Sequence, residues 1–180
     1  MKRNLSLKLA LVIQLLKQTR LSTKLVGQPL HFYRKYSIFV NGKLFNIMDI
    51  ATFREYCLSL PEVEETLPFD DDTLVYKVSG RMFAMISIRV PDHFAVKCHP
   101  DRAALLRERY VEITPGWHLN KRHWNDVSIV GELADSFLKA EIRHSYFAVV
   151  HNNVMPRSRR NMILAMAIDA GIVDDAEWIE

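Results

Sequence analysis

Three consecutive segments that alternate like β-strands constrain the fold of this chain more than any other feature of its sequence. In the first segment, Leu74, Tyr76 and Val78 alternate with the residues between them, which places their side chains on one face of a strand. Ser79 and Gly80 follow at once, and glycine supplies the positive φ that a tight hairpin turn needs. The sequence therefore predicts a three-stranded antiparallel meander, with strands at residues 74–78, 82–90 and 93–98.

Apolar residues at helical spacing precede and follow this meander. Asp49 is suited to cap a helix that carries an apolar stripe and ends at Pro61. Further helices are predicted to begin at Pro100 and to span residues 133–151 and 161–170, with a fourth strand at 127–130. Strands that are grouped together favour an α+β domain in the order α-β-β-β-α-β-α-α. Its antiparallel sheet, the meander plus one strand, would have about four strands covered by helices on one face.

The charged residues are distributed unevenly along the chain. Residues 1–48 contain nine Lys and Arg and no Asp or Glu, so residues 49–180 hold the other 15 of the 24 basic residues and all 21 acidic ones. This second part has a net charge of −6, although the whole chain has +3. The overall basicity therefore gives the folded part no support for nucleic-acid binding.

The basic N-terminal stretch leaves three interpretations open. Residues 48–54 have the pattern of a capped helix at which a domain could begin. We therefore expect residues 1–47 to be a basic N-terminal extension, either disordered or upstream sequence included by a mis-assigned start. A genuine extension of unknown role and a targeting peptide are the alternatives.

Several classes of protein and site lack support in the sequence. Cys57 and Cys98 are far apart and form no CxxC pair, which is typical of free thiols in a reducing cytoplasm. No apolar run reaches the roughly 18 to 20 residues of a membrane span. The six glycines never cluster into a phosphate-binding loop, and no nucleophile elbow occurs. We expect a cytoplasmic protein without a catalytic constellation, a cofactor or a metal site.

Residues 117–125 form the densest group of side chains that could bind a ligand. Lys121 and Arg122 could neutralise phosphates, and Asn120 could bond to bases or backbone. His123 adds a further group that can become cationic, and Trp124 could stack on a base. The alternative is structural, because tryptophans are usually core residues and asparagine commonly ties a turn.

A second basic cluster follows Pro156 at the start of a predicted helix. Arg157, Arg159 and Arg160 all lie where the helix dipole is positive, so the dipole does not stabilise them. Solvent, an acidic surface or a nucleic-acid backbone would have to serve as their partner.

Two motifs resemble the MmcQ/YjbR family of small bacterial proteins. Residues 68–78 and 81–84, PFDDDTLVYKV and RMFA, are similar to the first part of that family. Residues 118–125, HLNKRHWN, resemble its most distinctive motif, an Asn-Lys-x-His-Trp core, and residues 53–61 also match. The resemblance covers about residues 48–160, which leaves 161–180 as a C-terminal helix and tail.

The resemblance implies a frataxin-like α+β fold and a DNA-binding module without catalysis. Members are described as DNA-binding proteins with two hairpin wings. Here the first wing would turn at Gly80-Arg81, and the second would involve Asn120 to Asn125. Duplex DNA is the expected partner, bound by Arg81, Lys121, Arg122 and the arginines at 157, 159 and 160.

The alternative is a protein-interaction or chaperone-like domain. It would dock a protein partner through Trp117, Trp124 and the acidic loop Asp70–Asp72. The sequence does not indicate an oligomeric state.

Overall fold

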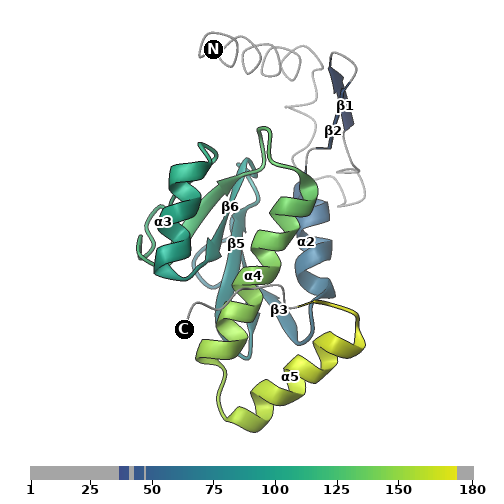
Figure 1. Cartoon of the computed structure of the whole chain (residues 1–180), viewed down its shortest axis with the longest axis vertical. Helices are drawn as coiled ribbons and strands as arrows, with labels where there is room; N and C mark the ends of the chain where they lie inside the picture. Colours follow the sequence, from purple (N-terminus) through teal and green to yellow (C-terminus); the bar gives the residue numbers. More distant parts are fainter. Residues whose placement is uncertain (1–36, 41–42, 47, 174–180) are drawn as a thin grey trace. The chain divides into compact units, whose positions relative to one another are not determined.

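The computed structural model describes residues 37–40, 43–46 and 48–173, all of which fall within the unit Tyr33–Glu180. Its main feature is a six-stranded antiparallel sheet packed with helices (Figure 1). The helices are α2 (Ile50–Ser59), α3 (Pro100–Arg109), α4 (Asp135–Asn153) and α5 (Arg157–Asp169). The strands, in spatial order, are β3 (Val63–Thr66), β4 (Thr73–Val78), β5 (Arg81–Ser87), β6 (His93–Lys97), β8 (Trp124–Ser128) and β7 (Ile113–Pro115).

Two further strands lie in the basic N-terminal stretch. β1 (Ser37–Val40) and β2 (Lys43–Asn46) pair antiparallel with each other. The rest of residues 1–47 lies outside the described residues, as does the tail from residue 174 onward. The division of the chain into an extension, a domain and a C-terminal tail therefore stays a prediction.

Local sequence signals account for where the first helix begins and where the central hairpin turns. The Asp49 side chain accepts a hydrogen bond from the Thr52 amide at 2.7 Å, which confirms Asp49 as the N-cap of α2. In the hairpin, Ser79 and Gly80 have φ values of 48° and 72°. Two consecutive positive φ angles are typical of the tight turn whose twist matches antiparallel strands.

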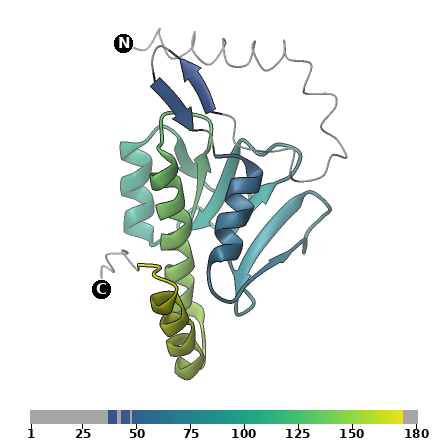
Figure 2. The ribbon, with the colours of Figure 1, turned by 90° about the vertical axis from the view of Figure 1, so that its right-hand side faces the viewer.

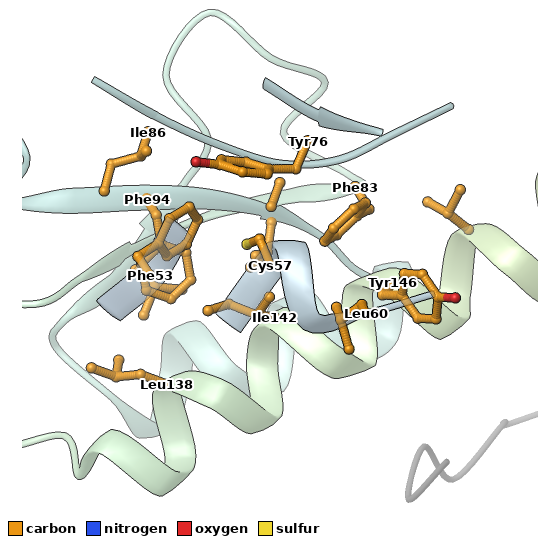
Figure 3. Close-up of a cluster of buried hydrophobic side chains, with 14 of the residues drawn as sticks. Phe53, Cys57, Leu60, Tyr76, Phe83, Ile86, Phe94, Leu138, Ile142 and Tyr146 are labelled. Atoms are coloured by element: carbon orange, nitrogen blue, oxygen red, sulfur yellow. The ribbon is translucent and has the colours of Figure 1, made fainter. Parts of the chain in front are cut away.

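The core lies between one face of the sheet and the helices α2, α3 and α4. The Phe53 ring of α2 contacts the rings of Tyr76 and Phe94, with centroids 5.5 and 4.9 Å away. Helix α4 packs on β5 and β6 (Figures 1 and 2). The rings of Tyr146 on α4 and Phe83 on β5 meet there edge to face. Figure 3 shows part of this cluster, in which the labelled side chains are Phe53, Cys57, Leu60, Tyr76, Phe83, Ile86, Phe94, Leu138, Ile142 and Tyr146.

The predicted α+β class is confirmed, but the predicted strand count was too low. The sheet has six strands, and β3 and β7 are the two that the sequence did not predict. Both missed strands lie at the edges of the sheet and have only four and three residues. Strands this short carry too few alternating positions to reveal their period.

The antiparallel order gives the sheet two ends that carry different residues. We call the hairpin end the end that holds the Ser79–Gly80 turn, the last residue of β6 (Lys97) and the first residue of β8 (Trp124). The opposite end, here called the aspartate end, holds the Asp70–Asp72 loop at the start of β4. Helix α4 runs from the aspartate end to the hairpin end, where the Lys97 ammonium donates to Asn153 Oδ1 at 2.9 Å.

The part of the chain that the structure describes contains neither a membrane-spanning helix nor a cluster of metal-binding side chains. None of its helices combines the length and apolar character that crossing a membrane requires. Its His, Cys, Asp and Glu side chains form no group of three that could hold a metal ion.

Candidate nucleic-acid interface

The segment between β7 and β8 is fixed to helix α3 by one arginine. The Arg107 guanidinium donates to the Asn125 side-chain oxygen at 2.7 Å. It also donates to two backbone carbonyls of the same segment, that of Lys121 at 2.5 Å and that of Trp124 at 3.0 Å. A guanidinium suits this task because its donors point in fixed, divergent directions. Arg107 therefore holds the segment in one conformation.

Two residues at the end of this segment are structural. Trp124 is 7% exposed and Asn125 is 1% exposed, so neither presents its side chain to solvent. A side chain at Gly116 would approach Cβ of Trp124 to 2.9 Å, which shows how closely the preceding turn covers this tryptophan. Trp124 is thus not available for stacking on a base in this structure, in contrast to what its residue type suggested.

Trp117, at the start of the segment, has the opposite environment. It is 74% exposed, and its ring meets that of His118 edge to face at 4.9 Å. Its amide donates to the Asp126 carboxylate at 2.8 Å. Burial raises the pKa of Asp126, against the smaller lowering effects of this hydrogen bond and of His93. The exposed tryptophan is therefore held at its backbone, while its ring remains free to contact a partner.

The middle of the segment projects two cations. Lys121 and Arg122 are both exposed, and neither side chain has a hydrogen bond or ion pair to another described residue. The Asn120 side-chain oxygen accepts from the Arg122 amide at 3.0 Å, and His123 donates its amide to the Asn120 carbonyl at 2.9 Å. Asn120 thus ties the turn, and half-buried His123 supports it through its backbone. The turn presents Lys121 and Arg122.

Of the four other arginines predicted to bind DNA, two already have a partner among the described residues of the protein and two do not. Arg159 pairs with Glu62 at 2.5 Å, and Arg160 donates to the His151 carbonyl at 2.9 Å. Arg81 and Arg157 are exposed, and their side chains have no hydrogen bond or ion pair among the described residues. Arg81 and Arg157 therefore remain able to bind an external anion.

The topology brings most of these cations to the hairpin end of the sheet. Arg81 opens β5 beside the turn, and Lys121 and Arg122 immediately precede β8. Arg157 lies in the first turn of α5, which reaches the hairpin end through the pair between Arg159 and Glu62. Glu62 lies there because it precedes Val63, the residue of β3 that pairs with Val78.

The acidic loop lies at the opposite end, and most of its carboxylates are used locally. Asp70 accepts from the amides of Asp72 and Thr73 at 3.0 and 2.6 Å, and these bonds lower its pKa. Asp72 accepts from the Ser87 hydroxyl at 2.8 Å and from the Arg89 amide at the same distance. The loop is therefore a turn that connects β3 and β4 and contacts the end of β5, rather than a free acidic docking surface.

Sequence reasoning missed one cation of the hairpin end. Lys97 is a half-buried residue at the end of β6, and its ammonium donates to Asn153 Oδ1. Burial lowers the pKa of Lys97, and the nearby positive charge of Arg81 lowers it further. A single lysine at a strand end carries no motif, so only the fold could reveal this environment.

Proteins of similar sequence match the region that contains these elements. A family model described as YjbR matches residues 58–148. YjbR of Escherichia coli strain K12 is 30% identical over 120 residues, which cover 66% of this chain and all of that protein. YbdF of Escherichia coli O157:H7 is 33% identical over 100 residues, which cover 55% of this chain and 82% of YbdF. Both relatives are described only as uncharacterised proteins.

Two solved structures are similar to this chain. DR2400 of Deinococcus radiodurans is 33% identical, with a TM-score of 0.58 over 73% of this chain and 94% of that protein. A protein from Pseudomonas syringae, 22% identical with a TM-score of 0.50, covers 56% of this chain and 98% of its own and shares the fold. The family match and the full-length match to YjbR together show that this chain belongs to the YjbR family.

Proposed function

We propose that this protein binds duplex DNA through the hairpin end of its sheet, without catalysing a reaction. The observation that supports the proposal is the separation of charge between the two ends. Four exposed cations without a partner among the described residues, Arg81, Lys121, Arg122 and Arg157, lie at the hairpin end or on the helix that reaches it. The Asp70–Asp72 loop lies at the other end.

This separation answers the objection raised by net charge. A part of the chain with a net charge of −6 would be repelled by DNA if its charges were mixed evenly. At about 0.1 M salt, charges more than about 10 Å apart are largely screened from each other. Phosphates at the hairpin end would therefore respond mainly to the cations there. The buried free thiols of Cys57 and Cys98 favour the reducing cytoplasm as the compartment for this function.

The test is a salt titration of binding to a labelled 20-base-pair duplex, with the full chain and a double substitution, Lys121→Glu with Arg122→Glu. If each side chain contacts a phosphate, affinity should fall by about 10- to 100-fold and the slope of log affinity against log salt should flatten by about two. The control is Lys139→Glu, which makes half that change in charge at a lysine of α4 that lies over the Tyr56 ring.

The salt slope also distinguishes this proposal from DNA binding by the N-terminal stretch. Residues 1–48 carry nine basic and no acidic residues, so they could attract DNA by charge alone. If binding came from that stretch, the double substitution would weaken it only in proportion to its charge change, and the salt slope would stay the same. That result would overturn the proposal.

A second function, docking of a protein partner, is supported by Trp117. An exposed tryptophan is the residue type that most often anchors a protein interface. Trp124 is buried and the acidic loop is bonded within itself, so Trp117 alone among those groups supports this alternative. Trp117→Ala should leave DNA affinity within about twofold under the first proposal, whereas it should abolish capture of a protein partner under the second.

A further inference from the structure

The strands β5 and β6 separate at the hairpin end of the sheet. Their last paired residues are Ala84 and Val96. Beyond them, the Ser145 hydroxyl of α4 donates to the Phe83 carbonyl at 2.6 Å and accepts from the Lys97 amide at 2.7 Å. A helix side chain thus replaces the direct hydrogen bond between the strands, and the two chains diverge around it.

Lys97 lies where the strands diverge, and its ammonium is incompletely satisfied. One of its three N–H donors reaches Asn153 Oδ1 at 2.9 Å, and that is its only hydrogen bond to another described side chain. An ammonium has three donors, so two remain for another acceptor. The same bond directs the Asn153 oxygen to Lys97, which leaves the amide NH₂ of Asn153 as a further donor beside it.

The charges around Lys97 favour an anion. Arg81 opens β5 and Lys97 ends β6 at the same end of the sheet, and the positive charge of Arg81 lowers the pKa of Lys97. Like charges at one end of the sheet repel unless an anion lies between them. Among the described residues, no carboxylate forms an ion pair with Lys97 or Arg81, and Glu62 at this end already pairs with Arg159. The described residues therefore place two cations at one end of the sheet without pairing either of them with a carboxylate.

We propose that Lys97, Asn153 and Arg81 form a phosphate-binding site at the divergence of β5 and β6. Lys97 would donate to one phosphate oxygen as a point charge, and Arg81 could engage two oxygens through its planar donors. The Asn153 amide would donate to an oxygen facing Lys97. This inference rests on the proposed function for its natural ligand, a backbone phosphate of DNA, although a free phosphate group has the same chemistry.

The first test uses inorganic phosphate and nuclear magnetic resonance of the full chain. Phosphate, compared with chloride at equal ionic strength, should shift the side-chain amide signals of Asn153. Lys97→Met should abolish that shift, because it removes the ammonium and keeps the Asn153 amide that is observed. Following an assigned signal keeps phosphate that binds to the basic N-terminal stretch out of the measurement. Absence of any shift at Asn153 in the parent protein would overturn the site.

The second test measures DNA binding by two variants of the site, with Lys139→Met as the matched control. Lys97→Met and Asn153→Asp should weaken binding by about three- to tenfold, and Lys97→Met should flatten the salt slope by about one. Thermal melts would check that each variant remains folded. The burial that lowers the pKa of Lys97 opposes its charged form, so Lys97→Met should not lower the melting temperature through lost charge.

The outcomes separate this inference from the proposed function. If Lys121→Glu with Arg122→Glu weakens DNA binding and flattens the salt slope as expected, while Lys97→Met behaves like Lys139→Met, the DNA-binding function stands and the phosphate site at Lys97 is refuted. If the parent protein binds no DNA but phosphate shifts the Asn153 amide and Lys97→Met abolishes the shift, the DNA-binding function fails. The site would then serve a phosphorylated ligand other than DNA.

Discussion

Asp126 is a half-buried carboxylate whose ionisation opposes folding. Burial raises its pKa above the usual value of 3.8, although the Trp117 amide and His93 act in the opposite direction. A carboxylate with a raised pKa in the folded state costs no stability below its unfolded pKa and destabilises the fold as pH rises through the folded value. At neutral pH the charge on Asp126 therefore reduces the free energy of unfolding.

Asp126→Asn should raise the midpoint of urea unfolding at pH 7. Asparagine keeps an oxygen that can accept from the Trp117 amide, while the charge is removed. Near pH 3 aspartate is largely protonated in both states, so the difference between variant and parent should vanish. The control is Asp71→Asn, because the Asp71 side chain is 89% exposed and should leave the midpoint unchanged. An equal gain at both pH values would show that the effect comes from packing instead of charge.

The exposure of the residues in the candidate segment could be predicted only in part from the sequence. Lys121 and Arg122 of residues 117–125 are exposed, as contact with phosphates would require, and whether the segment binds DNA stays a prediction. Trp124 and Asn125 are both buried, in a strand that pairs with β6 on one side and β7 on the other. Which residues of a polar-aromatic segment are buried depends on this pairing between distant strands, and the local pattern does not contain it.

Helix α4 is joined to the sheet by a hydroxyl as well as by apolar packing. Ser145 is fully buried, and its hydroxyl satisfies the Phe83 carbonyl and the Lys97 amide at once. Ser145→Ala would leave both backbone groups without that partner. Buried groups that lose their hydrogen bonds cost about 1–3 kcal/mol, so we expect a loss of that size in the free energy of unfolding.

Chemical denaturation would measure this loss against Ser136→Ala, an exposed serine near the start of the same helix. The control makes the same change in helix propensity without removing a buried bond. If both substitutions cost the same, the hydroxyl bridge does not stabilise the docking of α4.

The elements differ in how far sequence could predict them. The helix capped by Asp49 and the hairpin at Ser79–Gly80 were predictable because their signals lie within a few residues. β3 was missed because two of its four residues are glutamates, of which Glu65 turns inward to bond with the hydroxyl of Tyr76 at 2.8 Å. β7 ends in Pro115, which an edge strand tolerates and a central strand does not.

For the whole molecule, the position of charge should matter more than its sum. Residues 49–180 contain more acidic than basic residues, yet exposed cations gather at one end of the sheet. Two substitutions that each change the net charge by one unit distinguish control of DNA binding by the position of charge from control by the net charge. Lys121→Gln lowers the net charge by one at the hairpin end, and Asp71→Asn raises it by one at the aspartate end.

If DNA docks at the hairpin end, Lys121→Gln should weaken binding by about three- to tenfold and flatten the salt slope by about one. Asp71→Asn should change affinity by less than about twofold at 0.1 M salt. The charge of Asp71 lies at the far end of the sheet, so salt largely screens it from DNA bound at the hairpin end. Fluorescence anisotropy over a series of salt concentrations measures both quantities for each variant. If Asp71→Asn strengthens binding as much as Lys121→Gln weakens it, the net charge would govern association. The hairpin end would then have no privileged role, because a localised interface responds to the charges that face the DNA.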